Sequence, residues 1–159
     1  MHLEALHAAG EQLAEALDAG RVVLLPQRDE AVAAYRAAIA LAPKDALLRV
    51  QLGEALRDAG ALDDAARVLR EAVDLDPDSA SYWNALGMVL GAGGRLAEAE
   101  GAFREALSRD AATAQYAYNA GLAVERQGRA AEARSLYEEA LRRDPSFTPA
   151  RVRTRSRSR

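Results

Sequence analysis

The segment WNALGMVLGAGGRLAEAEGAF, residues 83–103, contains a glycine cluster that could bind a phosphate group. An apolar run, Leu86–Leu90, precedes the cluster at residues 91–94, and a segment with helical spacing follows it. Strand, glycine-rich loop and helix in this order bring several backbone N–H groups to one anion. The same residues could equally form two helices joined by a turn, which needs only one glycine in the left-handed conformation.

No other group of residues has the spacing of a catalytic or metal site. His2 and His7 are the only histidines, and five residues of separation do not place them on one helical face. The acidic pairs 63–64 and 138–139 occur among arginines, where solvated surface and ion pairs along a helix explain them. The serines have no histidine near them in the sequence pattern. We therefore expect that the chain is not an enzyme and binds neither a cofactor nor a metal.

Several series of residues recur every 34 positions, and this period decides between the two interpretations of the glycine cluster. The main series are Ala31, Ala65, Ala99 and Ala133; Tyr35, Leu69, Phe103 and Tyr137; Gly53, Gly87 and Gly121; and Gly60, Gly94 and Gly128. Only the last glycine of the cluster belongs to a series. The cluster therefore predicts a turn that ends a helix, and nucleotide binding is disfavoured.

Each period contains two amphipathic helical patterns, one on either side of the turn glycine. The first pattern has the spacing i, i+3, i+4, i+7 and consists of Trp83, Leu86, Gly87 and Leu90. The second, in residues 96–107, repeats that spacing, so the two apolar faces should pack together. Because Gly87 has no side chain, we expect it at a close crossing of the two helices. Every period is thus predicted to be a helix pair.

The composition supports a helical protein with a core of small side chains. Of the 159 residues 50% are apolar but only 5% are aromatic. The absence of cysteine excludes disulfides and thiolate metal ligands. There is no basic, apolar leader and no apolar run long enough to span a membrane, so we expect a cytoplasmic protein. All basic residues except Lys44 are arginine, which indicates a GC-rich, bacterial genome.

The combined pattern resembles the tetratricopeptide repeat (TPR) almost position for position. The residues that carry the resemblance are Pro77, Trp83, Leu86, Gly87, Leu90, Gly94, Ala99, Phe103 and Ala106. The resemblance implies an all-α fold, a right-handed superhelical solenoid of about four helix-turn-helix units, the first of them irregular. We expect one domain over residues 7–147. Its repeats are predicted at residues 7–45, 46–79, 80–113 and 114–147.

The first and last repeats depart from the pattern. Residues 12–17 match residues 51–56 at a distance of 39, which implies five inserted residues near 22–26. We expect these to form an apolar loop over the end of the stack rather than an exposed docking element. In the last repeat, alanines stand where Trp83 and Leu86 stand one period earlier, and Tyr116 or Tyr118 could fill part of the space.

The tail at residues 148–159 contains five arginines and no acid, whereas all 24 acidic residues lie in the rest of the chain. Phosphate binding by these arginines is disfavoured because no stacking aromatic follows Phe147 and the remainder is acidic. Thr148 and Pro149 could begin a short helix, but few apolar residues follow. We expect a disordered tail or a truncated capping helix. The last repeat would then expose an apolar surface suited to self-association, formed by Tyr137, Ala140 and Leu141.

The resemblance to the TPR family implies a noncatalytic scaffold that binds a peptide or protein segment in the concave groove. Helical geometry turns the residues opposite the packed face of each first helix into that groove. The expected groove residues are Leu47, Val50, Gln51, Glu54, Ser81, Asn84, Met88, Gln115, Tyr118, Asn119 and Leu122. The amides of Gln51, Asn84 and Asn119 could hydrogen-bond a ligand backbone. A second hypothesis is that the chain is the repeat region of a larger bacterial enzyme, such as a transferase or hydrolase.

The charges of the expected groove predict the chemistry of the partner. Glu11, Glu15 and Glu54 make its N-terminal half acidic, which favours an apolar partner with some basic residues. Family members that grip the C-terminal carboxylates of heat-shock chaperones use lysine, arginine and asparagine here. Val50 and Glu54 occupy two of those places, so such a partner is disfavoured. We expect neither a membrane nor a nucleic acid as partner.

Overall fold

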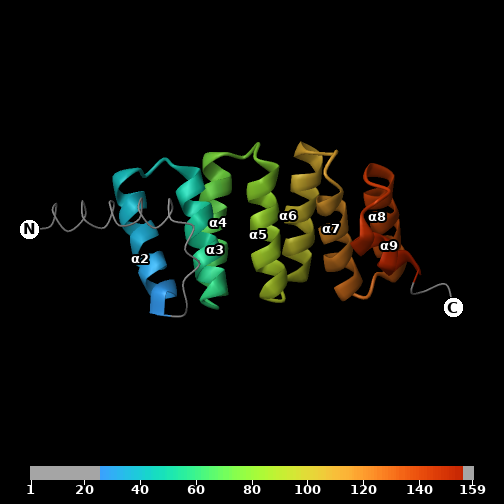
Figure 1. Cartoon of the computed structure of the whole chain (residues 1–159), viewed down its shortest axis with the longest axis horizontal. Helices are drawn as coiled ribbons and strands as arrows, with labels where there is room; N and C mark the ends of the chain where they lie inside the picture. Colours follow the sequence, from blue (N-terminus) through green and yellow to red (C-terminus); the bar gives the residue numbers. More distant parts are fainter. Residues whose placement is uncertain (1–25, 156–159) are drawn as a thin grey trace, which may run out of the picture. The chain divides into compact units, whose positions relative to one another are not determined.

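The computed structural model describes residues 26–155, and all regular structure in this range is helical (Figure 1). The helices are α2 (Pro26–Leu41), α3 (Ala46–Asp58), α4 (Leu62–Leu75), α5 (Ala80–Ala92), α6 (Leu96–Arg109), α7 (Ala114–Arg126), α8 (Ala130–Arg143) and α9 (Thr148–Arg155). The first helices of three pairs therefore begin 34 residues apart, at the starts of the expected repeats. The predicted all-α fold is confirmed.

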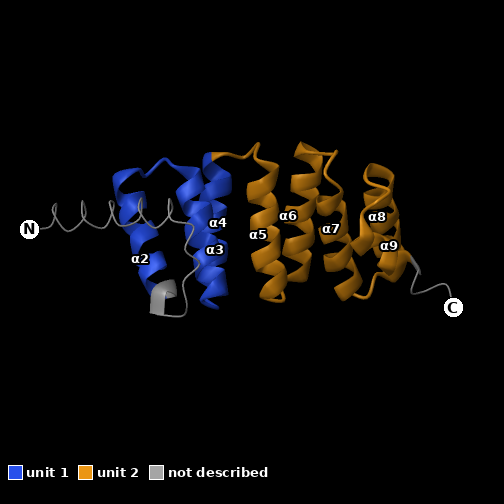
Figure 2. Ribbon diagram, in the orientation of Figure 1, with its two compact units in different colours: residues 1–75 blue, residues 76–159 orange. Residues whose placement is uncertain are grey.

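The chain forms two compact units, residues 1–75 and 76–159 (Figure 2), where the sequence predicts a single domain. Unit 1 contains α2, α3 and α4, with α3 packed against both of the others. Unit 2 contains α5 to α9, each packed against the next along the chain. Some features of the sequence lie outside the described residues: His2, His7, Glu11, Glu15, the segment 12–17, the inserted loop at 22–25 and residues 156–159.

The helix pairs are held by a glycine of the first helix that contacts a bulky side chain of the second. The contacts are Gly53 with Leu69, Gly87 with Phe103 and Gly121 with Tyr137. A Cβ atom on Gly87 would lie 2.6 Å from Cε1 of Phe103, well inside van der Waals contact. The glycine series and the series of bulky residues in the sequence thus form the two sides of one contact. The prediction that Gly87 lies at a helix crossing is confirmed.

Each of the three turn glycines adopts the left-handed backbone conformation that the turn requires. Gly60, Gly94 and Gly128 have φ angles of 81°, 76° and 82°. Residues other than glycine rarely adopt this backbone conformation. Behind Gly94, the N–H of Arg95 donates to the carbonyl of Leu90 at 2.9 Å and so closes the end of α5. The run Leu86–Leu90 is part of this helix. The glycine cluster is therefore a helix-ending turn, as the 34-residue period predicts.

The last repeat, whose first helix carries alanines in place of Trp83 and Leu86, contains a cluster of three aromatic rings. Ala117 and Ala120 are fully buried, and the ring of Tyr118 lies with its centroid 5.5 Å from that of Tyr137. The ring of Phe147 packs edge-on against Tyr118 at the same centroid distance. Of the two tyrosines that the sequence offers for this space, Tyr118 therefore contributes to the packing at the end of the chain.

The expectation of an exposed apolar surface on the last repeat is wrong. Residues 148–155 of the tail form α9, which packs against α8, and Ala150 is completely buried. Tyr137 is only 2% exposed and Ala140 is fully buried, while Leu141 is half-buried. The ring of Phe147, just before α9, packs against Tyr118 of α7. Self-association through this surface therefore loses its basis.

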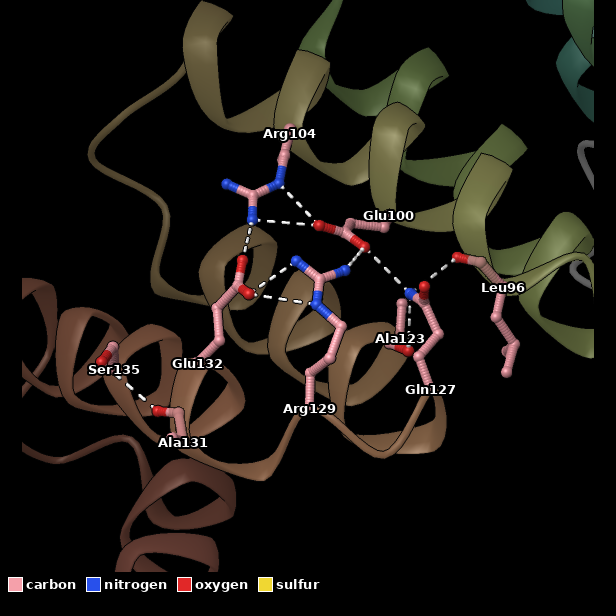
Figure 3. A network of polar contacts seen from close by, with 9 residues as sticks. All are labelled: Leu96, Glu100, Arg104, Ala123, Gln127, Arg129, Ala131, Glu132 and Ser135. Atoms are coloured by element: carbon pink, nitrogen blue, oxygen red, sulfur yellow. Dashed lines mark hydrogen bonds and ion pairs between the residues drawn. The ribbon is translucent and has the colours of Figure 1, made fainter.

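A polar network joins α6 to the turn between α7 and α8 (Figure 3). Glu100 accepts hydrogen bonds from Arg104 at 3.0 Å, from Gln127 at 2.9 Å and from Arg129 at 2.6 Å. The two arginines also pair with Glu132, so each carboxylate faces both cations. The network therefore ties two successive helix pairs of unit 2 together through charge-assisted hydrogen bonds.

The ionised form of Glu100 is the form that this network stabilises. Burial alone would raise the pKa of Glu100, but the hydrogen bonds from Gln127, Arg129 and Arg104 outweigh it and lower the pKa below the ordinary value of 4.5. A carboxyl whose pKa is lower in the folded state stabilises the fold above its unfolded pKa. That stabilisation is lost as the pH falls through the folded value.

The glycine contact can be tested with two alanine substitutions that have opposite expected signs. Gly87→Ala should cost about 1–3 kcal/mol, because the new methyl group displaces the buried ring of Phe103. Gly101→Ala is the control, since no atom lies within 4 Å of a Cβ at this helical position. It should stabilise the protein by about 0.5–1 kcal/mol. Denaturant unfolding measures both, and equal effects would contradict the packing described here.

The network can be tested by its dependence on pH. At neutral pH Glu100→Gln should lower the free energy of unfolding by about 1–3 kcal/mol, because the arginines lose a buried acceptor. The difference from the native chain should shrink below pH 4.5, where the native carboxyl becomes protonated. Glu138→Gln removes an exposed partner of Arg134 and should change stability by less than about 0.5 kcal/mol. A pH-independent effect of Glu100→Gln would rule out the ionised network as its cause.

Candidate binding face

The first helices of unit 2, α5 and α7, carry polar and apolar side chains that lie outside the glycine contacts and keep some exposure. We call this surface the α5–α7 face; its residues are Ser81, Asn84, Met88, Gln115, Tyr118 and Leu122. Ser81 and Gln115 are exposed, and Met88 is 44% exposed. Asn84, Tyr118 and Leu122 are half-buried, so Leu122 is less accessible than expected. Helix α5 has no charged residue, which makes its part of the surface neutral.

A chain of side-chain amides crosses this face from α7 to α5. Gln115 donates to Oδ1 of Asn119 at 2.8 Å, and Nδ2 of Asn119 donates to Oδ1 of Asn84 at 2.8 Å. Nδ2 of Asn84 in turn points at the sulfur of Met88, 3.6 Å away. Asn119 is 8% exposed, so it orients the other two amides rather than meeting a ligand itself. A thioether is a weak acceptor, and a peptide carbonyl would be a stronger partner for Asn84.

Charged residues border the face where α7 ends. Arg126 donates to the carbonyl oxygen of Gly91 at 2.7 Å and so bridges the two first helices. Glu125 accepts a hydrogen bond from the hydroxyl of Tyr137 at 2.8 Å. Burial, this hydrogen bond and the charge of Glu125 all raise the pKa of Tyr137, so the hydroxyl keeps its proton and remains a donor. The C-terminal edge of the face is thus polar and ordered by hydrogen bonds.

Unit 1 carries the remaining expected groove residues on α3. Leu47 and Glu54 are exposed and Gln51 is half-buried, which leaves all three accessible to a ligand. Val50 is only 8% exposed, so little of its side chain is open to a ligand. Helix α3 packs between α2 and α4, and the contact with α2 reduces its free surface.

Two sequence models described as tetratricopeptide repeat match the chain, at residues 26–89 and 84–146. The chain belongs to the tetratricopeptide repeat family. The matches cover the described helices from α2 to α8 and agree with the 34-residue period and the glycine turns. A comparison with curated proteins found no match.

Solved TPR structures resemble the fold of this chain. MamA is 26% identical with a TM-score of 0.75, over 81% of this chain and 75% of MamA. YrrB, described as a TPR protein with an unusual peptide-binding site, is 24% identical with a TM-score of 0.73, over 80% of this chain and 66% of YrrB. The Yersinia enterocolitica type III secretion chaperone SycD, in complex with a peptide of the translocator YopD, is 18% identical with a TM-score of 0.64, over 68% and 88%.

None of the helices in the described part of this TPR chain is both long and apolar enough to cross a membrane. The longest of them, α2, has 16 residues, and four polar or charged residues follow its first residue, Pro26. Its apolar residues follow the amphipathic pattern of the repeat. The apolar surface of these helices is used to pack one helix against another.

Proposed function

We propose that this TPR protein is a noncatalytic scaffold that binds a peptide or protein segment on the faces of its first helices. One observation carries the proposal: the side-chain amide of Asn84 donates to the weak thioether acceptor of Met88, whose side chain is itself exposed. A neutral surface that offers both an apolar contact and a backbone-binding amide suits a peptide. The relatives YrrB and SycD, whose descriptions mention a peptide-binding site and a bound peptide, support the proposal.

The proposed contacts fall into two kinds. Leu47, Met88 and Leu122 pack against apolar side chains of the partner, and the amides of Gln51, Asn84 and Gln115 bind its backbone or polar groups. Asn119 supports this role, because its side-chain amide hydrogen-bonds those of Gln115 and Asn84 and holds them in place. Ser81 and Tyr118 complete the surface. The proposed role requires no cofactor and no metal.

In this proposal unit 1 contributes negative charge, whereas α5 is neutral. Glu54 is exposed on α3, and its carboxylate suits a lysine or arginine of the partner. A partner that meets α3 would therefore be apolar with some basic residues. Glu11 and Glu15, which the sequence adds to the same acidic character, lie outside the described residues.

The experiment selects peptides that bind the intact chain from a displayed library of random short peptides and then measures their affinity for variants. Met88→Glu combined with Leu122→Glu should weaken binding about tenfold or more, because each buried apolar contact contributes about 1.5–3 kcal/mol. Met88→Glu alone should also weaken binding and leave the fold intact, since this side chain is exposed.

The matched control adds two carboxylates to the second helices. Ala97→Glu with Ala131→Glu changes two exposed residues in the first turns of α6 and α8, where an acid is tolerated or mildly favourable. This variant should bind as the native chain does. Helicity measured by circular dichroism separates unfolding from loss of contact, because Leu122 is half-buried. Unchanged affinity in a folded Met88/Leu122 double variant would exclude the α5–α7 face as the binding site.

A further inference from the structure

The 34-residue period continues into α9 and adds a third helix to the α5–α7 face. Tyr118 and Asn119 correspond to Val152 and Arg153 one period later. Both later residues are exposed, Val152 as one of the large exposed apolar side chains. Nη1 of Arg153 lies 3.2 Å from Oε2 of Glu125, which places α9 beside the end of α7. The tail that the sequence predicts as disordered or truncated therefore supplies part of the candidate surface.

Positive charge exceeds negative charge at this end of the face. Within α5, α7 and α9 the only acidic residue is Glu125, whereas α9 alone contains three arginines. The Glu125 side chain is 17% exposed and accepts a hydrogen bond from the hydroxyl of Tyr137, while the side chain of Arg153 is 45% exposed. A ligand on this surface therefore meets the guanidinium of Arg153 more readily than the carboxylate that pairs with it.

We propose that the partner segment carries an aspartate or glutamate that binds Arg153, next to apolar side chains that pack on Leu122 and Val152. The planar guanidinium matches a carboxylate in two parallel hydrogen bonds, and the neutral surface of α5 offers no competing acid. This inference rests on the proposed function and adds to it the charge of the partner at the α9 end. The partner is thus expected to be negatively charged at α9, whereas Glu54 favours positive charge on the partner at α3.

A carboxylate fits this surface better than the phosphates of a nucleic acid. Binding of single strands combines basic side chains with aromatic rings on which bases stack. The ring of Tyr118 is already packed against Tyr137 and Phe147. The first arginine of α9, Arg151, donates to the carbonyl of Pro145 and is held at the start of its own helix. Arg153 is the arginine that lies beside the end of α7, next to the exposed Val152, which suits an acidic side chain flanked by apolar ones.

The test repeats the selection from random displayed peptides with four forms of the intact chain: native, Arg153→Lys, Arg153→Glu and Arg134→Glu. Arg134 is exposed on α8 and supplies the same charge change away from the first helices. The native, Arg153→Lys and Arg134→Glu forms should enrich peptides with aspartate or glutamate beside apolar residues. Arg153→Glu should lose this preference or select lysine and arginine instead.

Affinity measurements on one enriched peptide give the size of the effect. Replacing its acidic residue by the amide should weaken binding to the native chain about two- to fivefold, the range of a partly exposed ion pair. The same replacement should have a smaller effect on Arg153→Gln, because the interaction is already absent. Circular dichroism of each variant checks that α9 remains helical, and the Arg153→Lys form retains the charge if Arg153→Glu loses the helix.

The outcomes separate this inference from the proposed function. Peptides without an acidic preference that still depend on Met88 and Leu122 would overturn the inference and leave the proposed function standing. An acidic preference that survives in Arg153→Glu would also overturn it. Failure to enrich any peptide would overturn both. A single-stranded DNA oligonucleotide is the last probe. If it binds more tightly than the enriched peptides, and if Arg153→Glu abolishes that binding, the partner at this surface is a nucleic acid and not an acidic peptide.

Discussion

The contact between a glycine of the first helix and a bulky side chain of the second determines most of this structure. With no side chain at Gly87, the ring of Phe103 reaches the backbone of α5, and any rotation of either helix would break that contact. Its counterparts at Gly53 and Gly121 hold the other described pairs in the same way. A fixed rotation of the first helix also fixes which residues face away from the pair. The candidate binding face is therefore a consequence of the packing on the opposite side.

The helix pairs of unit 2 need a second type of contact to stay in register with each other. Helix α6 of one pair packs against α7 of the next, and polar side chains link the two pairs at two places. The charges on Glu100, Arg104 and Arg129 supply that contact at the turn, while Asn119 and Asn84 supply it on the face. Both sets lie where two successive pairs meet. Polar groups thus fix the spacing between pairs, whereas apolar groups fix the geometry within them.

Local rules were enough to predict the pairs, and their failure elsewhere has identifiable physical causes. The left-handed turns at Gly60, Gly94 and Gly128 follow from one residue type at a constant spacing. The burial of Val50 was not predicted, because α3 packs against both α2 and α4 and the pattern of a single helix does not specify such packing. The short helix α9 agrees with the truncated capping helix that Thr148 and Pro149 allow, but its packing was not expected from so few apolar residues, although Ala150 is fully buried. Side-chain pairing such as that of Asn119 with Asn84 depends on distances between helices, which a repeat pattern does not specify.

The last repeat shows how a packing residue can set the charge of a distant surface. Tyr137 fills the place that Leu69 and Phe103 fill in earlier repeats, but it brings a hydroxyl group into the core. A buried hydroxyl needs an acceptor, and Glu125 provides it at 2.8 Å. A carboxylate with so little exposure needs a cation in turn, and Arg153 on α9 lies 3.2 Å away. The choice of tyrosine at a helix crossing therefore leads, through two polar contacts, to an arginine at the edge of the binding face.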